Sequence, residues 1–533
     1  MGNKGMQDRR SFLKGAGVAA ATAATFALAG CAPAKESSGK DSTSASSTAW
    51  DEEFDVIVVG AGIAGLAAAV TVATEGDKAT CLLIEKDTMP NGNSPFAFGT
   101  SIYAENAEDA KVYIDQLIGG TTPDDVIAAY CAGMTENLDW ILKLGATESD
   151  LKITRPDPKV TMEYPELKND DKIGKFSFSS KGETATHTQK FLEGIVEQHA
   201  DTITYKTSTP LESLIQDPLT KAITGVTAKG KNYKAKKGII MCCGGFESDP
   251  DMLVTFTGVE GVYPYAGRAN TGDGHRACMK VGADMWHMSG GAQFWLACRD
   301  LENTKFISTV WNWSNKQHGI TVGVNGRRFY QDWDGCALPT GYAEPDSDLT
   351  RNVGYRHGLT QFGGNWAHLP LPPHAWFLFD AKGLAEGALP AETSTDPVAD
   401  GWALTANTIE ELAATIEVPA EELTHTVEVW NDFCAGGEDK AFYRPAESLV
   451  SLSEPPYYAM RCVPAMLNTD GGPRRSAKAE ILDPDGNPIA HLYSAGEFGS
   501  IWGHLYQGAG NISECMVFGR IAARNAIANE AIA

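Results

Sequence analysis

The clearest pattern in the chain is the apolar, mostly β-branched run at residues 54–59. A near-continuous run of this kind is typical of a strand that is buried on both faces of a parallel sheet. Residues 63–75 follow with helical spacing and stop at Gly76, and residues 81–85 form a second short apolar run that ends in an acid. The pattern predicts a strand, a helix and a second parallel strand.

Two later segments repeat the strand pattern. Residues 237–246 and 491–497 are apolar runs that end in small residues, so both are expected to join the same sheet. A long helical pattern covers residues 512–528, directly after the glycine-containing turn at 508–511. Between residues 286 and 437 this rhythm breaks into short segments punctuated by glycine, proline and asparagine. The chain therefore predicts an α/β fold with a different unit in its middle.

The turn between the first strand and the first helix carries three glycines with separate roles. Gly60 would make the tight turn, Gly62 would let the backbone approach a pyrophosphate, and Gly65 would let the helix pack on the strand. Glu85, at the end of the second strand, could accept both ribose hydroxyls. With its strand, helix and acid all present, the turn predicts dinucleotide binding; the alternative is a glycine-rich turn in an ordinary α/β domain.

FAD suits the following stretch better than NAD does. Asn93 and Ser94 come within ten residues of the acidic strand end, and extra donors there suit a longer, extended cofactor. A second glycine fingerprint for NAD(P)H is not visible, so electrons would come from a partner. The eleven cysteines show no spacing for covalent haem, zinc or an iron–sulfur cluster, and no metal site is expected.

The first fifty residues have the pattern of an export segment. Arg9 and Arg10 begin a twin-arginine signal, and the weakly apolar stretch at 15–30 is too short to span a membrane. Cys31 lies where a lipoprotein cleavage box requires the acylated cysteine; the alternative is a plain export signal with an incidental cysteine. Residues 1–31 are thus assigned to the signal and residues 32–50 to a flexible tether.

The formal net charge of −24 argues against a nucleic-acid partner, because phosphate binding needs a basic surface. An acidic surface suits docking to a basic electron carrier instead. The twin-arginine route carries proteins that are already folded, so the signal itself favours a cofactor inserted before export. The expected location is the outer side of the cytoplasmic membrane, with membrane contact only through a lipid anchor.

These segments together resemble the FAD-binding domain of the fumarate reductase/flavocytochrome c superfamily, with active-site features nearer to 3-ketosteroid dehydrogenases. The resemblance implies a Rossmann-like FAD-binding domain at residues 51–285 and 438–533, with an inserted α+β capping domain at 286–437. Asp273 belongs to a Thr-Gly-Asp-Gly turn of the family. The FAD contacts implied by position are Gly60, Gly62, Ala64, Gly65, Glu85, Asn93, Ser94, Gly99, Cys243, Asp273, Glu497, Ile512 and Ser513.

The residues before the last helix differ from those of fumarate reductases. The position of their proton-donating arginine is occupied by Gln507, which cannot donate a proton and regenerate. Tyr506 beside it resembles the acid/base tyrosine of the ketosteroid enzymes, so it is the first catalytic candidate. The other candidates are His504, Arg328 and His187. Arg474 and Arg475 are interpreted as a solvated pair or as an anchor for a carboxylate.

The expected activity is reduction of an activated C=C bond in a small molecule, an enone or an unsaturated acid, by hydride transfer from flavin N5. The donor would be a membrane-linked cytochrome or quinol system. Two alternatives stay open: a ketosteroid-type dehydrogenase that desaturates its substrate, and a non-catalytic flavoprotein that relays electrons. Seven of the twelve tryptophans lie between 286 and 376 and could line an aromatic substrate cavity or pack the inserted domain.

Overall fold

A computed structural model gives the fold of the chain. It describes residues 48–97, 99–160, 162–164, 167–178, 187–258, 260–300, 307–310, 318–330, 332, 374–389, 391, 393–444 and 446–532. The residues from Trp50 onward form one compact unit. The signal and most of the predicted tether, including Cys31, therefore lie outside the described residues. No helix within the described ranges combines the length and the apolar composition that a membrane span needs.

The larger sheet has a parallel centre in the order β20-β9-β1-β2-β6. The strands of this centre are β1 (Glu52–Val59), β2 (Cys81–Ile84), β6 (Ile203–Lys206), β9 (Lys231–Met241) and β20 (Pro488–Ser494). Val59 pairs with Ile84 on one side and with Met241 on the other, and Ser494 also pairs with Met241. The carboxyl ends of these strands therefore lie level, so the residues that follow them meet along one edge.

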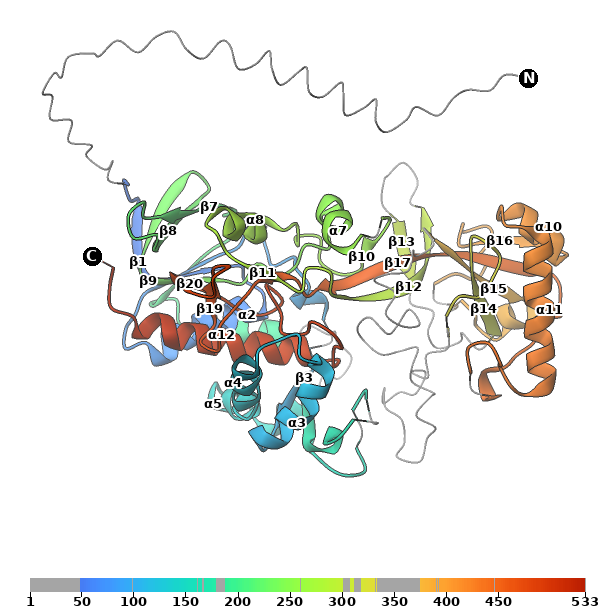
Figure 1. The fold of residues 1–533 in the computed structure, drawn as a ribbon, viewed down its shortest axis with the longest axis horizontal. Coiled ribbons are helices and arrows are strands. Elements are labelled where there is room, and N and C mark those ends of the chain that lie inside the picture. The colour runs from blue at the N-terminus through green and yellow to red at the C-terminus, as the bar shows by residue number, and fades with distance from the viewer. Residues whose placement is uncertain are drawn as a thin grey trace, which may run out of the picture. The chain divides into compact units, whose positions relative to one another are not determined.

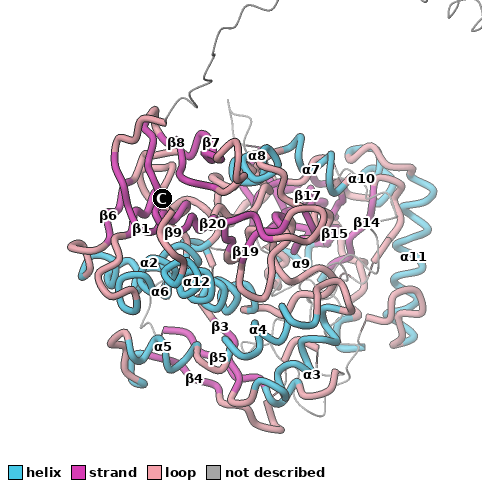
Figure 2. Tube along the Cα trace, turned by 60° about the vertical axis from the view of Figure 1, so that its left-hand side comes forward, coloured by secondary structure: helices cyan, strands magenta, loops and turns pink. Residues whose placement is uncertain are grey.

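Helices and strands cover both faces of this sheet, as its apolar strands require. Helices α2 (Ile63–Glu75), α6 (His187–Gln198) and α12 (Gly510–Ala528) lie together beside the sheet (Figure 2). Val58 packs into their core, whereas Ile57 packs into a second core on the opposite face. The elements that extend the sheet or pack on that opposite face are β7 (Leu211–Gln216), β8 (Ile223–Ala228), β19 (Glu480–Leu482) and α8 (Asp273–Lys280).

A small layer of helices and strands packs near the start of α12. Its members are β3 (Ser101–Ala104), β4 (Leu151–Thr154), β5 (Ile173–Phe178), α3 (Ala107–Ile118), α4 (Asp124–Met134) and α5 (Asn137–Lys143). Asn106 caps α3 by accepting hydrogen bonds from the backbone N–H groups of Glu108 and Asp109. This layer brings α3 and the loop residues 162–164 beside the turn that precedes α12.

A second sheet forms the other part of the unit (Figure 1). Its strands are β10 (Tyr263–Pro264), β12 (Gly291–Asp300), β13 (Ile307–Val310), β14 (Gly319–Gly323), β15 (Ala375–Asp380), β16 (Ala403–Ala406) and β17 (Tyr457–Thr469). The remaining elements are α7 (Pro250–Thr257), α9 (Ala381–Ala385), α10 (Ile409–Thr415), α11 (Ala420–Gly436), β11 (Met285–Trp286) and β18 (Gly472–Pro473). Within this sheet, β17 pairs with β12, β15 and β16, and α10 and α11 pack on it through a shared apolar core.

The predicted fold class is confirmed: a mainly parallel sheet with helices, and a separate α+β region between its parts. The helix predicted at residues 63–75 has those bounds, and the last helix begins two residues earlier than predicted, at Gly510. The predicted domain bounds at 285/286 and 437/438 stay a prediction. The second sheet includes β17, which lies within the range assigned to the last part of the FAD-binding domain.

Candidate active site

A cavity of about 620 Å³ lies along the carboxyl edge of the larger sheet. It is lined by residues that follow β1, β2, β9 and β20, by the loop after β2, and by the start of α12. The residues predicted to bind the cofactor that line it are Gly60, Gly62, Ala64, Glu85, Asn93, Ser94, Cys243, Asp273, Glu497 and Ile512. The fold thus brings into one cavity residues that are more than 450 positions apart in the chain.

The turn after β1 has the geometry that its glycines require. Gly60 has a φ of +100°, and a Cβ atom there would collide with the carbonyl of Cys242. A Cβ at Gly62 would lie 2.9 Å from the Ser94 hydroxyl, which accepts a hydrogen bond from the backbone N–H of Ile63 at 3.0 Å. The turn is therefore bare of side chains where it faces the cavity, which leaves room for a pyrophosphate at the start of α2.

Glu85 holds this turn from the end of β2. Its carboxylate accepts hydrogen bonds from the backbone N–H groups of Ala61 and Asp87, both at 3.1 Å. Burial raises the pKa of Glu85, while these two hydrogen bonds oppose the rise. The carboxylate lies where a ribose would meet it if the pyrophosphate occupied the glycine turn.

Three of the predicted cofactor residues do not line the cavity. Gly65 is packed so closely against the Gly60 carbonyl that a Cβ there would collide with it, which is the packing role expected of the third glycine. Gly99 accepts a hydrogen bond from the Thr188 hydroxyl through its carbonyl oxygen. The Ser513 hydroxyl accepts one from the Asn137 side chain at 2.8 Å and is fully buried. Their direct contact with the cofactor stays a prediction.

Several buried acids lie near one another beside the cavity, and we call Glu247, Asp470, Glu497 and Glu514 the edge cluster; Glu497 lines the cavity itself. The Asn93 amide donates hydrogen bonds to Glu247 at 2.7 Å and to Glu497 at 3.1 Å. Burial is the main cause that raises the pKa of each of the four, for Glu514 to about 7. Burial therefore favours the neutral form of these four acids.

Arg475 is the positively charged residue next to the edge cluster. The prediction that it forms a solvated pair with Arg474 is wrong. Its side chain is fully buried and lies 3.5 Å from Glu514. Its guanidinium donates hydrogen bonds to the backbone carbonyls of Gly496, Phe498 and Gly499. Arg475 therefore holds the loop after β20, which carries Glu497, in place. Because it does not line the cavity, it is not available there to anchor a carboxylate.

Tyr506 lies in the cavity wall, in the turn before α12. Its side chain is buried, and its ring packs edge-on against Trp502 with 5.7 Å between the ring centres. Burial raises the pKa of Tyr506 well above its usual range, the charges of Glu163 and Glu497 add to this, and a hydrogen bond with the Asn511 backbone opposes it. The phenol is therefore held in its protonated form in the wall of the cavity.

Gln507 points away from the cavity, unlike its neighbour. It is buried, and its Oε1 atom accepts hydrogen bonds from the Tyr113 hydroxyl at 2.6 Å and from the Glu163 backbone N–H at 3.3 Å. Its Nε2 atom donates to the Gly508 carbonyl at 3.0 Å. Gln507 therefore joins the small layer to the turn before α12 and takes no proton-transfer role.

The other catalytic candidates lie elsewhere. His504 is exposed and adjoins Gly119 rather than the cavity. Arg328 is buried in the region of the second sheet, where it donates to Asp439 at 2.8 Å and stacks on Trp430. His187 begins α6, and its side chain lies outside the description. The structure therefore brings only Tyr506, of these four, into the cavity among the described side chains.

The aromatic residues of the central region were expected either to line a substrate cavity or to pack internally. Among those described, Trp286, Tyr330 and Trp376 are buried in apolar cores and do not line the cofactor cavity. The other tryptophans of that stretch, and Tyr342, have side chains outside the description. Packing is therefore the role of Trp286 and Tyr330, whereas Trp376 packs in a core and also lines a second cavity, beside Tyr263 and Arg461.

Glu163 and Glu247 were missed by the sequence analysis. Glu247 follows β9 by a few residues, so the position of a strand end could have indicated it. Glu163 lies in a loop without any periodic pattern and reaches the cavity only through the tertiary fold. No local signal in the sequence marks it.

The cavity suits FAD. Its glycine turn has no room for side chains, Glu85 follows the second strand, and the start of α12 presents backbone groups to the cavity. The Asn511 side-chain oxygen is buried at this cavity with no hydrogen-bond partner among the described residues, so a bound group could supply one.

Comparison with known proteins agrees with this geometry. Residues 55–512 match the model of the FAD binding domain family, and residues 6–26 match the twin-arginine translocation signal. The chain is similar to a digoxin reductase of Eggerthella lenta, with 26% identity over 98% of this chain and 97% of that protein. It is also similar to a 3-oxosteroid 1-dehydrogenase of Mycolicibacterium smegmatis, with 25% identity over 90% of this chain and 98% of that protein.

The fold is shared with a solved 3-ketosteroid Δ1-dehydrogenase of Sterolibacterium denitrificans. The TM-score is 0.72 at 20% identity, and the match covers 90% of this chain and 100% of that chain. The predicted superfamily, cofactor and export route are thereby confirmed. The chain belongs to the FAD binding domain family and is an FAD-dependent oxidoreductase acting on carbon–carbon bonds, with a twin-arginine signal for export.

Proposed function

We propose that this protein is an exported reductase that saturates an activated C=C bond next to a carbonyl group, with Tyr506 as its acid. The observation that carries the proposal is the position of Tyr506, which is buried in the cavity wall in the turn before α12. A phenol in a dry site can either donate a proton or polarise a carbonyl by hydrogen bonding. Both roles serve reduction of an α,β-unsaturated carbonyl compound.

The reaction divides between the cofactor and the protein. FAD, once bound and reduced, would supply a hydride to the β-carbon of the substrate. Tyr506 would supply the proton to the α-carbon, and the start of α12 would favour negative charge that develops on the bound groups. The buried surroundings of Tyr506 keep water from competing for that proton.

The polar lining supports a neutral carbonyl substrate over a dicarboxylate. No arginine or histidine is found among the described residues that line the cavity, and Lys86 there is engaged with Asp273 at 2.7 Å. Two carboxylates would therefore find no arginine or histidine partner among these described lining residues. An enone, or an acid with a single carboxylate, fits this lining better.

Desaturation is the second candidate, because microscopic reversibility allows one site to run in both directions. The 3-oxosteroid 1-dehydrogenase relative supports it. In that direction Tyr506 would accept a proton or polarise a ketone, and the electrons would leave to an acceptor. We favour reduction because the relative that spans almost the whole chain is a reductase.

Electrons would arrive from a membrane-linked cytochrome or quinol donor, and Cys31 would carry a lipid that keeps the enzyme beside that donor. A Cys31→Ser variant, which cannot be acylated, should leave the membrane fraction while still being exported. The measurement is detergent phase partition of the exported protein. Equal partition of both forms would show that the cysteine carries no anchor.

The test of the function is anaerobic photoreduction of the purified flavoprotein, followed by mixing with enones, cinnamates, dicarboxylates and steroids. Enone reoxidation of the flavin supports the proposal, and Tyr506→Phe should slow it by about 10²- to 10⁴-fold. Retention of the yellow absorbance in the variant is the control for folding. Turnover of dicarboxylates would overturn the interpretation of Gln507, and desaturation alone would overturn the direction.

A further inference from the structure

Tyr506 needs a source of protons if it acts once per turnover. Only 8% of its surface is exposed, so its oxygen has poor access to bulk water after it has given up a proton. Two carboxyl groups line the same cavity, Glu163 and Glu497. Both line the cavity together with Tyr506, and their charges raise the pKa of its phenol. One of these groups could return the proton.

Glu163 is fixed next to the turn that carries Tyr506. Its carboxylate accepts a hydrogen bond from the Gly508 backbone N–H at 2.6 Å, and its own backbone N–H donates to Gln507 at 3.3 Å. The Tyr113 hydroxyl donates to the same Gln507 oxygen at 2.6 Å. Glu163 is 6% exposed, so its carboxyl is held in the cavity wall and not in solvent. The loop residues 162–164 and the turn 506–508 therefore form one hydrogen-bonded unit.

A second acid, Asp170, lies next to the loop that carries Glu163. Asp170, which is half-buried at the start of a short 3-10 helix, accepts a hydrogen bond from the Met162 backbone N–H at 3.4 Å. Asp170 and Glu163 both act on the hydroxyl of Tyr113, so the three groups are neighbours. Burial raises the pKa of Asp170 to about 6, which suits a group that exchanges protons with water near neutral pH.

Glu497 faces inward instead. It accepts hydrogen bonds from Asn93 and Asn511, and Asn93 joins it to the buried Glu247. Titratable groups face Tyr113 and Tyr506 from the elements packed around them. Those on the side of the small layer are Glu163, Tyr164 and Asp170, and those on the side of the edge cluster are Asp470 and Glu497. Of these, Glu163 and Asp170 connect Tyr506 to the partly exposed side of the small layer.

We propose that Glu163 is a relay residue that returns a proton to Tyr506 after each turnover and is itself reloaded through Asp170. The inference rests on the proposed function, in which Tyr506 protonates the α-carbon of the substrate. The O–H bond of Glu163 breaks as the O–H bond of Tyr506 forms, and water restores the carboxyl proton by way of Asp170. One proton passes from solvent to substrate for each C=C bond that is reduced.

The test separates the first turnover from the later ones. Glu163→Gln keeps an oxygen to accept the Gly508 N–H bond but cannot pass on a proton. Because Tyr506 is protonated before the first turnover, single-turnover reoxidation of the photoreduced holoenzyme should keep more than half of the wild-type rate. Steady-state turnover with a mediator as electron source should fall by about 10- to 100-fold, with a larger solvent deuterium isotope effect. The substrate is the enone that reoxidises the wild-type flavin fastest.

Matched variants complete the experiment. Glu163→Asp should recover part of the steady-state rate, and Asp170→Asn should lower that rate, whereas Asp171→Asn, whose side chain pairs with Lys172 at 2.8 Å, should not. A wild-type steady-state rate in Glu163→Gln overturns the relay. Equal loss of the first turnover shows a positional role and overturns it as well. Failure of every panel compound with the wild type overturns the proposed function, and this inference with it.

Discussion

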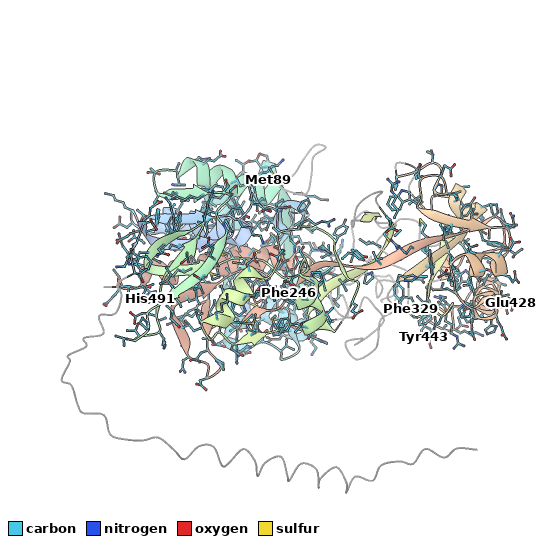
Figure 3. All side chains as sticks on the ribbon, turned by 90° about the horizontal axis from the view of Figure 1, so that it is seen from above. Met89, Phe246, Phe329, Glu428, Tyr443 and His491 are labelled. Carbon is cyan, nitrogen blue, oxygen red and sulfur yellow. The ribbon has the colours of Figure 1, made fainter. Side chains whose placement is uncertain are left out.

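Two buried clusters of charged residues in this protein shift the pKa values of their carboxyl groups in opposite directions. In the region of the second sheet, Arg328 and Arg444 pair with Asp332 and Asp439, with contacts from 2.8 to 3.6 Å. We call these four residues the cap cluster. In the edge cluster, four acids have Arg475 as the nearby cation. Figure 3 shows Phe329 and Tyr443, sequence neighbours of the two cap arginines, in a different region from Phe246, the neighbour of Glu247.

The two clusters differ in the ratio of buried acids to buried cations, and this difference indicates a structural role for one and a chemical role for the other. In the cap cluster, burial alone would raise the pKa of Asp439, but the hydrogen bond and charge of Arg328 bring it below its usual value. Those acids are ionised and hold elements together. In the edge cluster burial prevails and raises the pKa values, which favours the neutral form of these acids near the cofactor cavity. An excess of buried acids over cations is a better sign of function here than a buried charge by itself.

The largest expected effect comes from breaking the cap cluster. Arg444→Met leaves Asp332 with Arg328 at 3.6 Å as its remaining ion-pair partner and should lower the free energy of unfolding by about 3–5 kcal/mol. Urea unfolding of the holoprotein measures this. The flavin spectrum of the folded variant should be unchanged, because none of the four residues lines the cofactor cavity. A loss of stability near zero would contradict a structural role for the cluster.

The same chemical change should have different results in the two clusters. Asp439→Asn removes an ionised partner of Arg328 and should destabilise the protein by about 3 kcal/mol at pH 7. Burial raises the pKa of Glu497 and favours its neutral form, so Glu497→Gln should change stability by less than about 1 kcal/mol. Both are measured by urea unfolding in one buffer. Equal losses would mean that Glu497 is ionised in the folded protein.

The pH dependence of stability should follow the edge cluster above pH 5. Because its acids have raised pKa values in the folded protein, that state binds more protons than the unfolded chain, and the free energy of unfolding falls as the pH rises. For Glu514 the window runs from its unfolded pKa of about 4 to its folded value of about 7. The Tm should decline between pH 5 and 7, and less steeply in Asp470→Asn. A Tm that rises over this range would contradict the assignment.

The smallest effect is expected from an exposed pair that adjoins the cap cluster in sequence. Arg327 contacts Glu422 at 2.6 Å on the surface, directly before Arg328. Arg327→Ala should move the Tm by no more than about 1 °C, because exposed ion pairs are screened by water and salt. Differential scanning calorimetry measures it. A shift as large as that of Arg444→Met would show that position in the sequence, and not burial, sets the strength of these pairs.

Local pattern was sufficient for the cofactor half of the molecule. The apolar run at 54–59, the glycines and Glu85 lie within about thirty residues, and each constrains its neighbours through backbone geometry that is written in nearby residue types. A glycine with positive φ at residue 60 and a helix at 63–75 follow from those neighbours alone. The fold class and the choice of FAD could be predicted for the same reason.

The catalytic surroundings depend on contacts that no local pattern records. Glu163 meets Gly508 across 345 positions, and Asn93 meets Glu497 across 404, so their pairing exists only once the sheet and the small layer have assembled. Arg474 and Arg475 are identical in type, yet one is partly exposed and the other is buried under the loop after β20. Residue identity determined which chemistry was available, whereas burial and long-range packing decided which groups carry it, because solvent access is a property of the assembled fold.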